Sequence, residues 1–224
     1  MSVLGTIWSM AAAINLAFGA VQLMIWRQTH QPTRSTLFLV MTFGAAFICI
    51  LEMMMFSTSD AALHNQLLVL GNLTVALVSI SLVWFIKVYL ESDGIFWPTL
   101  VTVFWSVGII ANFLLPGNLT FSEITAVKQA MTPWGESFYV VKGVSNSWVW
   151  LVNVTVVIIP VYITRSAWKA RSSGLAQDGW IISAGALTFY LIAGGLIVRR
   201  FGIRHSRFFQ ETLMKRLNWV RISE

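Results

Sequence analysis

Residues 5–26 read GTIWSMAAAINLAFGAVQLMIW, and residues 36–57 read TLFLVMTFGAAFICILEMMMFS. Neither stretch holds a lysine or arginine, and Glu52 is their only acidic residue. A helix needs about 20 consecutive apolar residues to cross the hydrocarbon core of a bilayer. A strand with open edges would leave backbone polar groups unpaired in lipid, so helix is the expected conformation. These two stretches therefore predict membrane-spanning helices.

The composition of the whole chain agrees with a membrane protein. Of its 224 residues, 57% are hydrophobic and 11% are charged, whereas soluble domains carry about 25% charged residues. The net charge is +6; because the basic residues flank apolar runs, membrane topology and lipid headgroups explain them better than nucleic acid does. The single cysteine, Cys49, excludes a disulfide within the chain. No catalytic motif is found, so neither an enzyme, a cofactor nor a metal site is expected.

The sequence predicts an all-α fold, a polytopic transmembrane helix bundle of six spans covering residues 1–198. The first span lacks the basic leader of a cleaved signal peptide, so it is expected to be retained. Several tryptophans fall near the proposed span ends, where amphipathic rings prefer the headgroup level. The spans are expected near residues 5–26, 36–57, 67–90, 95–115, 146–163 and 180–198.

Loop charges predict the orientation of the bundle. One set of loops carries six basic residues, which are Arg27, Arg34, Lys87, Arg165, Lys169 and Arg171. The opposite loops carry only Lys128 and Lys142. Basic residues gather on the cytoplasmic side, so the amino terminus is expected outside the cytoplasm, in a bacterial inner membrane.

The basic tail at 199–224 conflicts with this orientation. With six spans and an external amino terminus, its seven basic residues would also lie outside. A missing or altered seventh span, a miscounted span and an inverted topology all remain open. Apolar residues at helical spacing predict an amphipathic helix on a membrane surface or against a partner; these residues are Phe209, Leu213, Leu217 and Val220.

The loop at 116–145 is the only sizeable loop, and it is expected on the extracytoplasmic side. Two extended runs, Ile124–Met131 and Ser137–Lys142, are joined by Thr132-Pro133-Trp134-Gly135. Proline followed by glycine two residues later is typical of a turn. A small β-hairpin is therefore predicted, and it would need the helix bundle as its floor.

Polar residues inside the spans are the candidates for function. Glu52 should face the bundle interior, because an ionisable group at that depth costs at least about 2.5 kcal/mol; a ligand or proton contact and a hydrogen-bonded structural role both fit. Buried amides more often hold helices together than bind ligands. His64 is expected at the outer end of the third span, as a solvated helix-end residue or as a pH-sensitive contact to the loop. The amides in question are Asn15, Gln22, Asn72, Asn112 and Asn153.

Five short segments stand out in the order Val88-Tyr89-Leu90, Ile110–Leu114, Leu119–Ile124, Pro133–Glu136 and Gly143–Asn146. Together they resemble the N-terminal multi-span sensor regions of bacterial sensor histidine kinases and related PAS- or diguanylate-cyclase-linked receptors. The resemblance covers most of residues 5–198 and implies seven helices, an external loop capping the bundle and a cytoplasmic output domain. This chain departs from that pattern after about residue 200, where the basic tail stands in place of the last helix and output module.

Three functional interpretations fit these features. A membrane sensory input domain would bind a small ligand or membrane component beneath the loop and pass a helix shift to a homodimer mate, a signalling partner or an appended domain. A small transporter or channel subunit would instead need a water-accessible path through Glu52 and the amides. A truncated receptor fragment without output is the third alternative. The expected ligand-binding residues are Glu52, His64, Asn112, Glu123, Trp134, Glu136 and Asn146.

Overall fold

The computed structural model describes residues 2–28, 32–91, 94–132 and 134–170, together with residues 180, 184, 185 and 187. The chain divides into two compact units, residues 1–187 and 188–224, and every described residue belongs to the first. Most of the predicted sixth span at 180–198, and the whole tail at 199–224, lie outside the described residues. Both therefore stay predictions.

Five long apolar helices and one two-stranded antiparallel sheet make up the described part of the chain. Each helix is long and apolar enough to cross a membrane. A mostly helical fold with long apolar helices at five of the predicted spans is confirmed, while a sixth span is not. In chain order the elements are α1 (Val3–Gln28), α2 (Pro32–Ser57), α3 (Ala61–Tyr89), α4 (Phe96–Leu114), β1 (Phe121–Met131), β2 (Ser137–Ser145) and α5 (Val149–Ala170).

Two helix boundaries lie furthest from the predicted ends of the spans. Helix α3 begins at Ala61 rather than near residue 67, because Asp60 caps it by accepting a hydrogen bond from the backbone N–H of Ala62 at 2.9 Å. Asp is a favoured N-cap residue, since its side chain satisfies an otherwise unpaired N–H of the first turn. Helix α5 runs on to Ala170, so Arg165 and Lys169 belong to its last turns and not to a loop.

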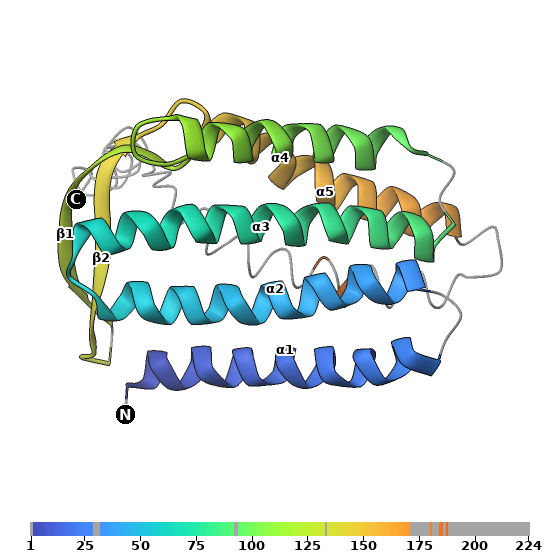
Figure 1. Ribbon diagram of the computed structural model, residues 1–224, viewed down its shortest axis with the longest axis horizontal. Helices are drawn as coiled ribbons and strands as arrows, with labels where there is room; N and C mark the ends of the chain where they lie inside the picture. Colours follow the sequence, from blue (N-terminus) through green and yellow to red (C-terminus); the bar gives the residue numbers. More distant parts are fainter. Residues whose placement is uncertain are drawn as a thin grey trace, which may run out of the picture. The chain divides into compact units, whose positions relative to one another are not determined.

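The helices pack as sequential neighbours with α3 at the centre. Contacts join α1 to α2, α2 to α3, α3 to α4, and α5 to both α3 and α4. Figure 1 shows α1 to α4 side by side, with the β-hairpin running across one set of helix ends. We call this the hairpin end; it holds the first residues of α1, α3 and α5. The opposite end, with the last residues of those three helices, is the basic end.

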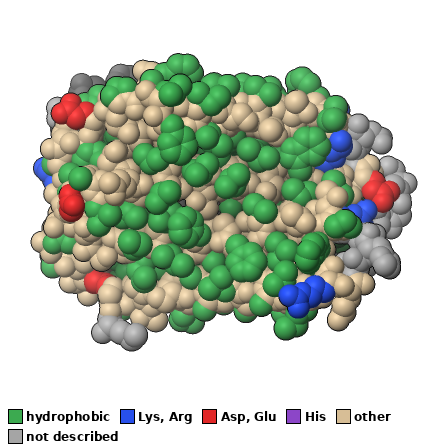
Figure 2. All heavy atoms as spheres, viewed as in Figure 1, with side chains coloured by type: hydrophobic (Ala, Val, Ile, Leu, Met, Phe, Trp, Pro, Cys, Tyr) green, Lys and Arg blue, Asp and Glu red, His purple; other side chains and the backbone are tan. Residues whose placement is uncertain are grey.

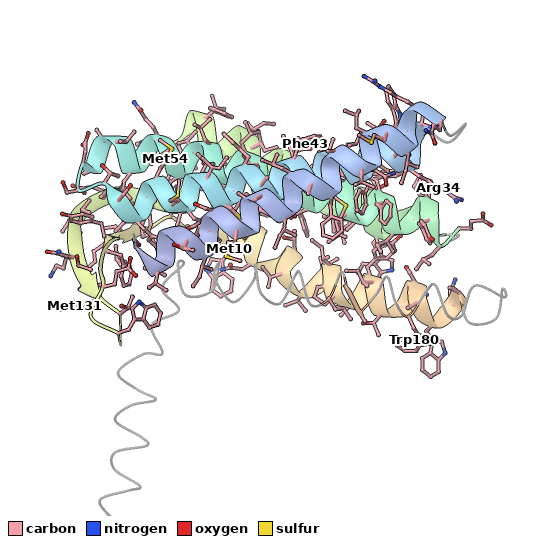
Figure 3. The ribbon with its side chains drawn as sticks, turned by 90° about the horizontal axis from the view of Figure 1, so that it is seen from below. Met10, Arg34, Phe43, Met54, Met131 and Trp180 are labelled. Atoms are coloured by element: carbon pink, nitrogen blue, oxygen red, sulfur yellow. The ribbon has the colours of Figure 1, made fainter. Side chains whose placement is uncertain are left out.

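Burial follows this arrangement. Helix α3 contacts three other helices and one strand and contributes many buried residues, whereas only Ala12 and Gly19 of α1 are buried. Apolar side chains cover the middle of the face drawn in Figure 2, and the charged groups on that face lie towards the two ends. Figure 3 places Met131 at the hairpin end and Arg34 at the basic end. A belt of apolar side chains between charged ends is the surface expected of a helix bundle in a bilayer.

The predicted hairpin is confirmed, and its strands are longer than expected at the ends near the bundle. Phe121 pairs with Ser145 and Met131 with Ser137, with irregular register between Phe121 and Glu123 and between Ile124 and Ala126. Gly135 has a φ of +85° in the turn, a conformation that glycine adopts without steric cost. The turn closes through the backbone N–H of Thr132, which donates to the carbonyl of Glu136 at 2.8 Å.

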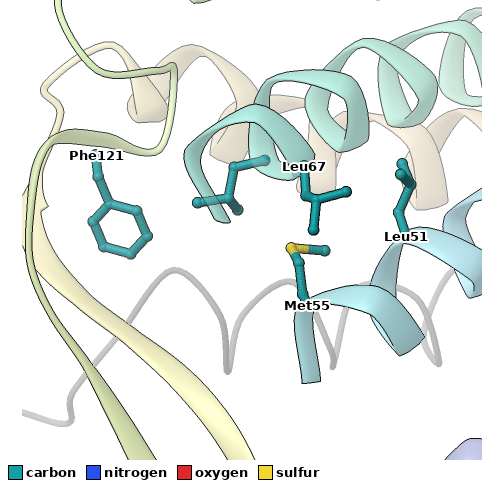
Figure 4. Close-up of a cluster of buried hydrophobic side chains, with 5 residues drawn as sticks. Leu51, Met55, Leu67 and Phe121 are labelled. Carbon is teal, nitrogen blue, oxygen red and sulfur yellow. The ribbon is translucent and has the colours of Figure 1, made fainter. Parts of the chain in front are cut away.

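A cluster of buried apolar side chains forms the floor of the hairpin. Phe121 of β1 lies with Leu51 and Met55 of α2 and with Leu67 and Leu68 of α3 (Figure 4). Removing a side chain of this size from water contributes about 1.5–3 kcal/mol. The hairpin thus packs on the bundle, and its need for this support stays a prediction.

Candidate functional site

Three polar side chains form a buried group between α3, α4 and the segment that follows α4. Asn72 donates through Nδ2 to Asn112 Oδ1 at 3.0 Å and to Thr120 Oγ1 at 3.3 Å. The other amide group, Asn112 Nδ2, donates to the carbonyl of Val69 at 3.0 Å. Asn72, Asn112 and Thr120 are 8%, 2% and 1% exposed, so protein groups rather than solvent satisfy them. Asn112 thus joins two helices.

Asn118 extends this polar group towards the hairpin end. Its Oδ1 accepts from the backbone N–H groups of Thr120 at 2.7 Å and Phe121 at 2.9 Å, and its Nδ2 donates to Asn65 Oδ1 at 2.7 Å. Asn146 Nδ2 donates to the carbonyl of Asn118 at 3.0 Å. The segment that leads into β1 is therefore fixed to the start of α3 and to the residue that follows β2.

Asn112 and Asn146 consequently have a structural explanation. Asn146 Oδ1 also accepts from the backbone N–H of Trp148 at 3.2 Å, next to the first turn of α5. The amides of both residues are engaged within the protein, and neither residue lines a described pocket. Packing, the more common role of buried amides, accounts for them; a ligand role for either stays a prediction.

A pocket of about 580 Å³ lies at the hairpin end, between the hairpin tip, the start of α1 and the end of α2. It brings together two of the predicted ligand-binding residues, Trp134 and Glu136. Its other walls come from the first residues of α1 and the last turn of α2, including Trp8 and Phe56. Aromatic walls around one carboxylate suit a ligand with an apolar or cationic surface.

Glu136 is held in this pocket by three donors. Its carboxylate accepts from the backbone N–H of Leu4 at 3.1 Å, from Trp134 Nε1 at 3.2 Å and from the hydroxyl of Ser2. A carboxylate at a helix N-terminus is favoured because it offsets the positive end of the helix dipole. The hairpin tip is therefore tied directly to the first turn of α1.

Aromatic rings connect the same three segments. The ring centroids of Trp8 and Phe56 are 6.1 Å apart, and those of Phe56 and Phe138 are 5.5 Å apart with their planes at 81°. Edge-to-face pairs of this kind contribute about 0.5–1.5 kcal/mol beyond the area they bury. Phe56 of α2 thus bridges α1 and β2 along one wall of the pocket.

The remaining predicted residues are scattered. Glu52 is half-buried on α2 beside Met53, which lines the pocket, but Glu52 itself is not a lining residue. His64 is 2% exposed and its Nδ1 lies 3.2 Å from the carbonyl of Asp60, so the expectation of a solvated histidine is wrong. It fails because α3 begins earlier than predicted and buries this turn. Glu123 is exposed on β1.

Several pocket residues escaped the sequence analysis. Trp8 is one of the tryptophans near the proposed span ends, for which only a position at the headgroup level is expected, and Phe56 and Phe138 have no distinguishing pattern. Asn118 did carry a usable signal, because asparagine often accepts a hydrogen bond from the backbone N–H two residues later. Its bond to Thr120 N is that contact.

Comparison of the chain with protein-family models, with curated proteins and with solved structures gives no match. The resemblance to receptor sensor regions therefore stays a prediction.

Proposed function

We propose that this chain is the membrane-embedded sensory input region of a bacterial signal-transduction receptor. A small ligand binds in the pocket between the hairpin tip and the first turn of α1. The observation that carries this proposal is the composition of the pocket walls, which come from α1, α2 and the hairpin. One bound molecule touches all three segments, so it can favour one of two arrangements of these helices.

The contacts of Glu136 supply a route from ligand to helix. Its carboxylate bonds to the first turn of α1 and to Trp134 of the turn. A ligand that competes for this carboxylate weakens the tie between the hairpin and α1. Helix α1 has few other restraints, since among the described helices its extensive contacts are with α2 and only Ala12 and Gly19 of α1 are buried. A shift of α1 relative to α2 is therefore the conformational change we propose.

Charge supports an external position for this pocket. At the basic end the described cations are Arg27, Arg34, Lys87, Arg165 and Lys169. The hairpin carries only Lys128 and Lys142, beside the acidic Glu123 and Glu136. Since basic residues favour the cytoplasmic side, the proposed orientation puts the hairpin outside the cytoplasm of a bacterial inner membrane.

Binding can be tested by thermal unfolding of the purified chain with choline, phenethylamine and indole as probes. Choline and phenethylamine carry the positive charge that Glu136 and the aromatic walls suit, and indole tests the walls alone. We expect a probe to raise the unfolding midpoint of the wild type, and the rise to be lost in Trp134→Ala. Glu136→Gln should lose the response to the two cations, and it should retain more of the response to indole than Trp134→Ala does.

Glu123→Gln is the matched control, because Glu123 is an exposed carboxylate of the same hairpin that does not line the pocket. Each rise is measured from the variant's own midpoint without probe, since loss of the Glu136 contacts also lowers stability. An equal response in wild type, Trp134→Ala and Glu136→Gln would remove the hairpin tip from the site.

A small transporter or channel subunit is the second candidate, and the half-buried Glu52 on α2 is the observation that favours it. An acidic residue inside a span commonly belongs to a proton or ion path. Flux in proteoliposomes that disappears in Glu52→Gln, with binding at the hairpin pocket unchanged, would favour transport over sensing.

A further inference from the structure

A second pocket, of about 350 Å³, lies at the basic end between the start of α4 and the last turns of α5. Its residues from α5 include Arg165 and Lys169, which are four positions apart and so lie on the same side of the helix. Tyr162 and Ser166, 1% and 2% exposed, are the buried residues from α5 in the lining. Two cations thus stand beside a concave surface.

The start of α4 contributes a further positive element. Gly94 and the aromatic residues Phe96 and Trp97 line the pocket there. Ile95, at the N-cap position, makes no side-chain capping hydrogen bond, so its side chain satisfies none of the first N–H groups of α4. Such groups, with the positive end of the helix dipole, attract anions. A Cβ added to Gly94 would meet no heavy atom within 4 Å, which shows open space at this point.

The described acidic residue nearest in sequence to the start of α4 is engaged elsewhere. Glu91 pairs with Arg34, with Oε1 and the guanidinium nitrogen 3.4 Å apart. Asp93 lies outside the described residues. Among the described lining residues, the charged side chains are therefore both cationic.

We propose that this pocket binds a phosphate group, and that the phosphate belongs to the headgroup of an anionic phospholipid. Arginine suits phosphate because its planar guanidinium can donate two parallel hydrogen bonds, and lysine adds a compact charge. Basic pockets between membrane helices on the cytoplasmic side are suited to anionic lipid headgroups. The site is separate from the pocket under the hairpin, and it does not depend on sensing.

Aromatic residues at the same end favour a lipid over a free phosphate ion. Phe96 is 63% exposed and Trp168, next to Lys169 in sequence, is 64% exposed. Exposed aromatic rings at the end of a span match the headgroup level of a bilayer. A lipid can place its phosphate between Arg165 and the start of α4 while its acyl chains follow the apolar faces of these helices.

The test is thermal unfolding of the full chain in a neutral detergent with dioleoylphosphatidylglycerol, dioleoylphosphatidylcholine or inorganic phosphate. We expect phosphatidylglycerol to raise the midpoint and phosphatidylcholine to leave it unchanged. The rise should need at least a two-fold higher lipid concentration in Arg165→Gln and disappear in the double variant Arg165→Gln with Lys169→Gln. Arg27→Gln is the matched control, since it removes an exposed charge at the same end outside this pocket.

The outcomes separate the two phosphate sources. Inorganic phosphate could raise the midpoint as much as phosphatidylglycerol does, with the rise lost in the double variant. That result would contradict a lipid ligand and indicate that the site binds free phosphate. An equal phosphatidylglycerol response in wild type and Arg165→Gln would overturn the site. If Arg27→Gln weakens the phosphatidylglycerol response as much as Arg165→Gln does, the site is also contradicted, because general surface charge would then explain binding. Arg165→Gln alone decides the matter should the double variant fail to fold.

Discussion

Replacing Asn118 with alanine should loosen the whole hairpin end. The side chain makes three hydrogen bonds of 2.7 to 2.9 Å, to Thr120 N, Phe121 N and Asn65. Because Asn118 is fully buried, alanine would leave two backbone N–H groups and one amide oxygen without these partners. Each bond contributes about 1 kcal/mol net in soluble proteins and about 0.6 kcal/mol between membrane helices. The expected loss is therefore about 2–3 kcal/mol.

This loss corresponds to a midpoint lower by roughly 4–12 °C, taking about 2–4 °C per kcal/mol for a chain of this size. Cys49 provides the assay, because it is the single cysteine and is 8% exposed. A thiol-reactive fluorescent dye reports its exposure as the protein is heated in detergent. The midpoint then follows from the rise in fluorescence.

The control is Asn153→Ala on α5. Asn153 is a half-buried amide that loses the same atoms on substitution, and it makes no side-chain hydrogen bond within the described ranges. Its midpoint should stay close to that of the wild type. If Asn118→Ala unfolds at the same temperature as Asn153→Ala, the polar group around Asn118 does not hold the hairpin end together.

Three further predictions concern helix packing, the hairpin and the orientation. Gly44→Ala places a Cβ 2.4 Å from a methyl group of Val78 on α3, so it should lower the unfolding midpoint, and a double-mutant cycle with Val78→Ala should show partial rescue; additive losses would contradict a direct contact. In Gly143→Ala the added Cβ would lie 2.3 Å from the carbonyl oxygen of Glu123. This variant should lower the midpoint more than Gly135→Ala, where the space is open and the cost is the φ of +85°, about 1 kcal/mol. The reverse order would contradict the strand pairing. Glu123→Cys, in a chain whose native cysteine is alanine, should react with a membrane-impermeant maleimide added outside spheroplasts; labelling only after lysis would invert the proposed orientation.

The sequence determined which segments are helical because a bilayer imposes one simple demand. Backbone groups in hydrocarbon must be paired within the segment, so a long apolar stretch such as residues 36–57 has one stable conformation. The hairpin turn could also be predicted from local sequence, since Gly135 supplies the conformation that the turn requires. The start of α3 was missed because His64 and its polar neighbours look like a loop until the capping role of Asp60 is recognised.

The candidate site depended on tertiary structure because its parts are far apart in the chain. Glu136 and Leu4 are separated by 132 positions, and no periodicity links them. Likewise, the sequence offers Asn72 and Asn112 as buried amides, but only the packing of α3 against α4 decides that they bond to each other. Hydropathy acts on each segment alone and therefore fixes the helices; hydrogen-bond partners and pocket walls require helices to meet, which only the folded arrangement specifies.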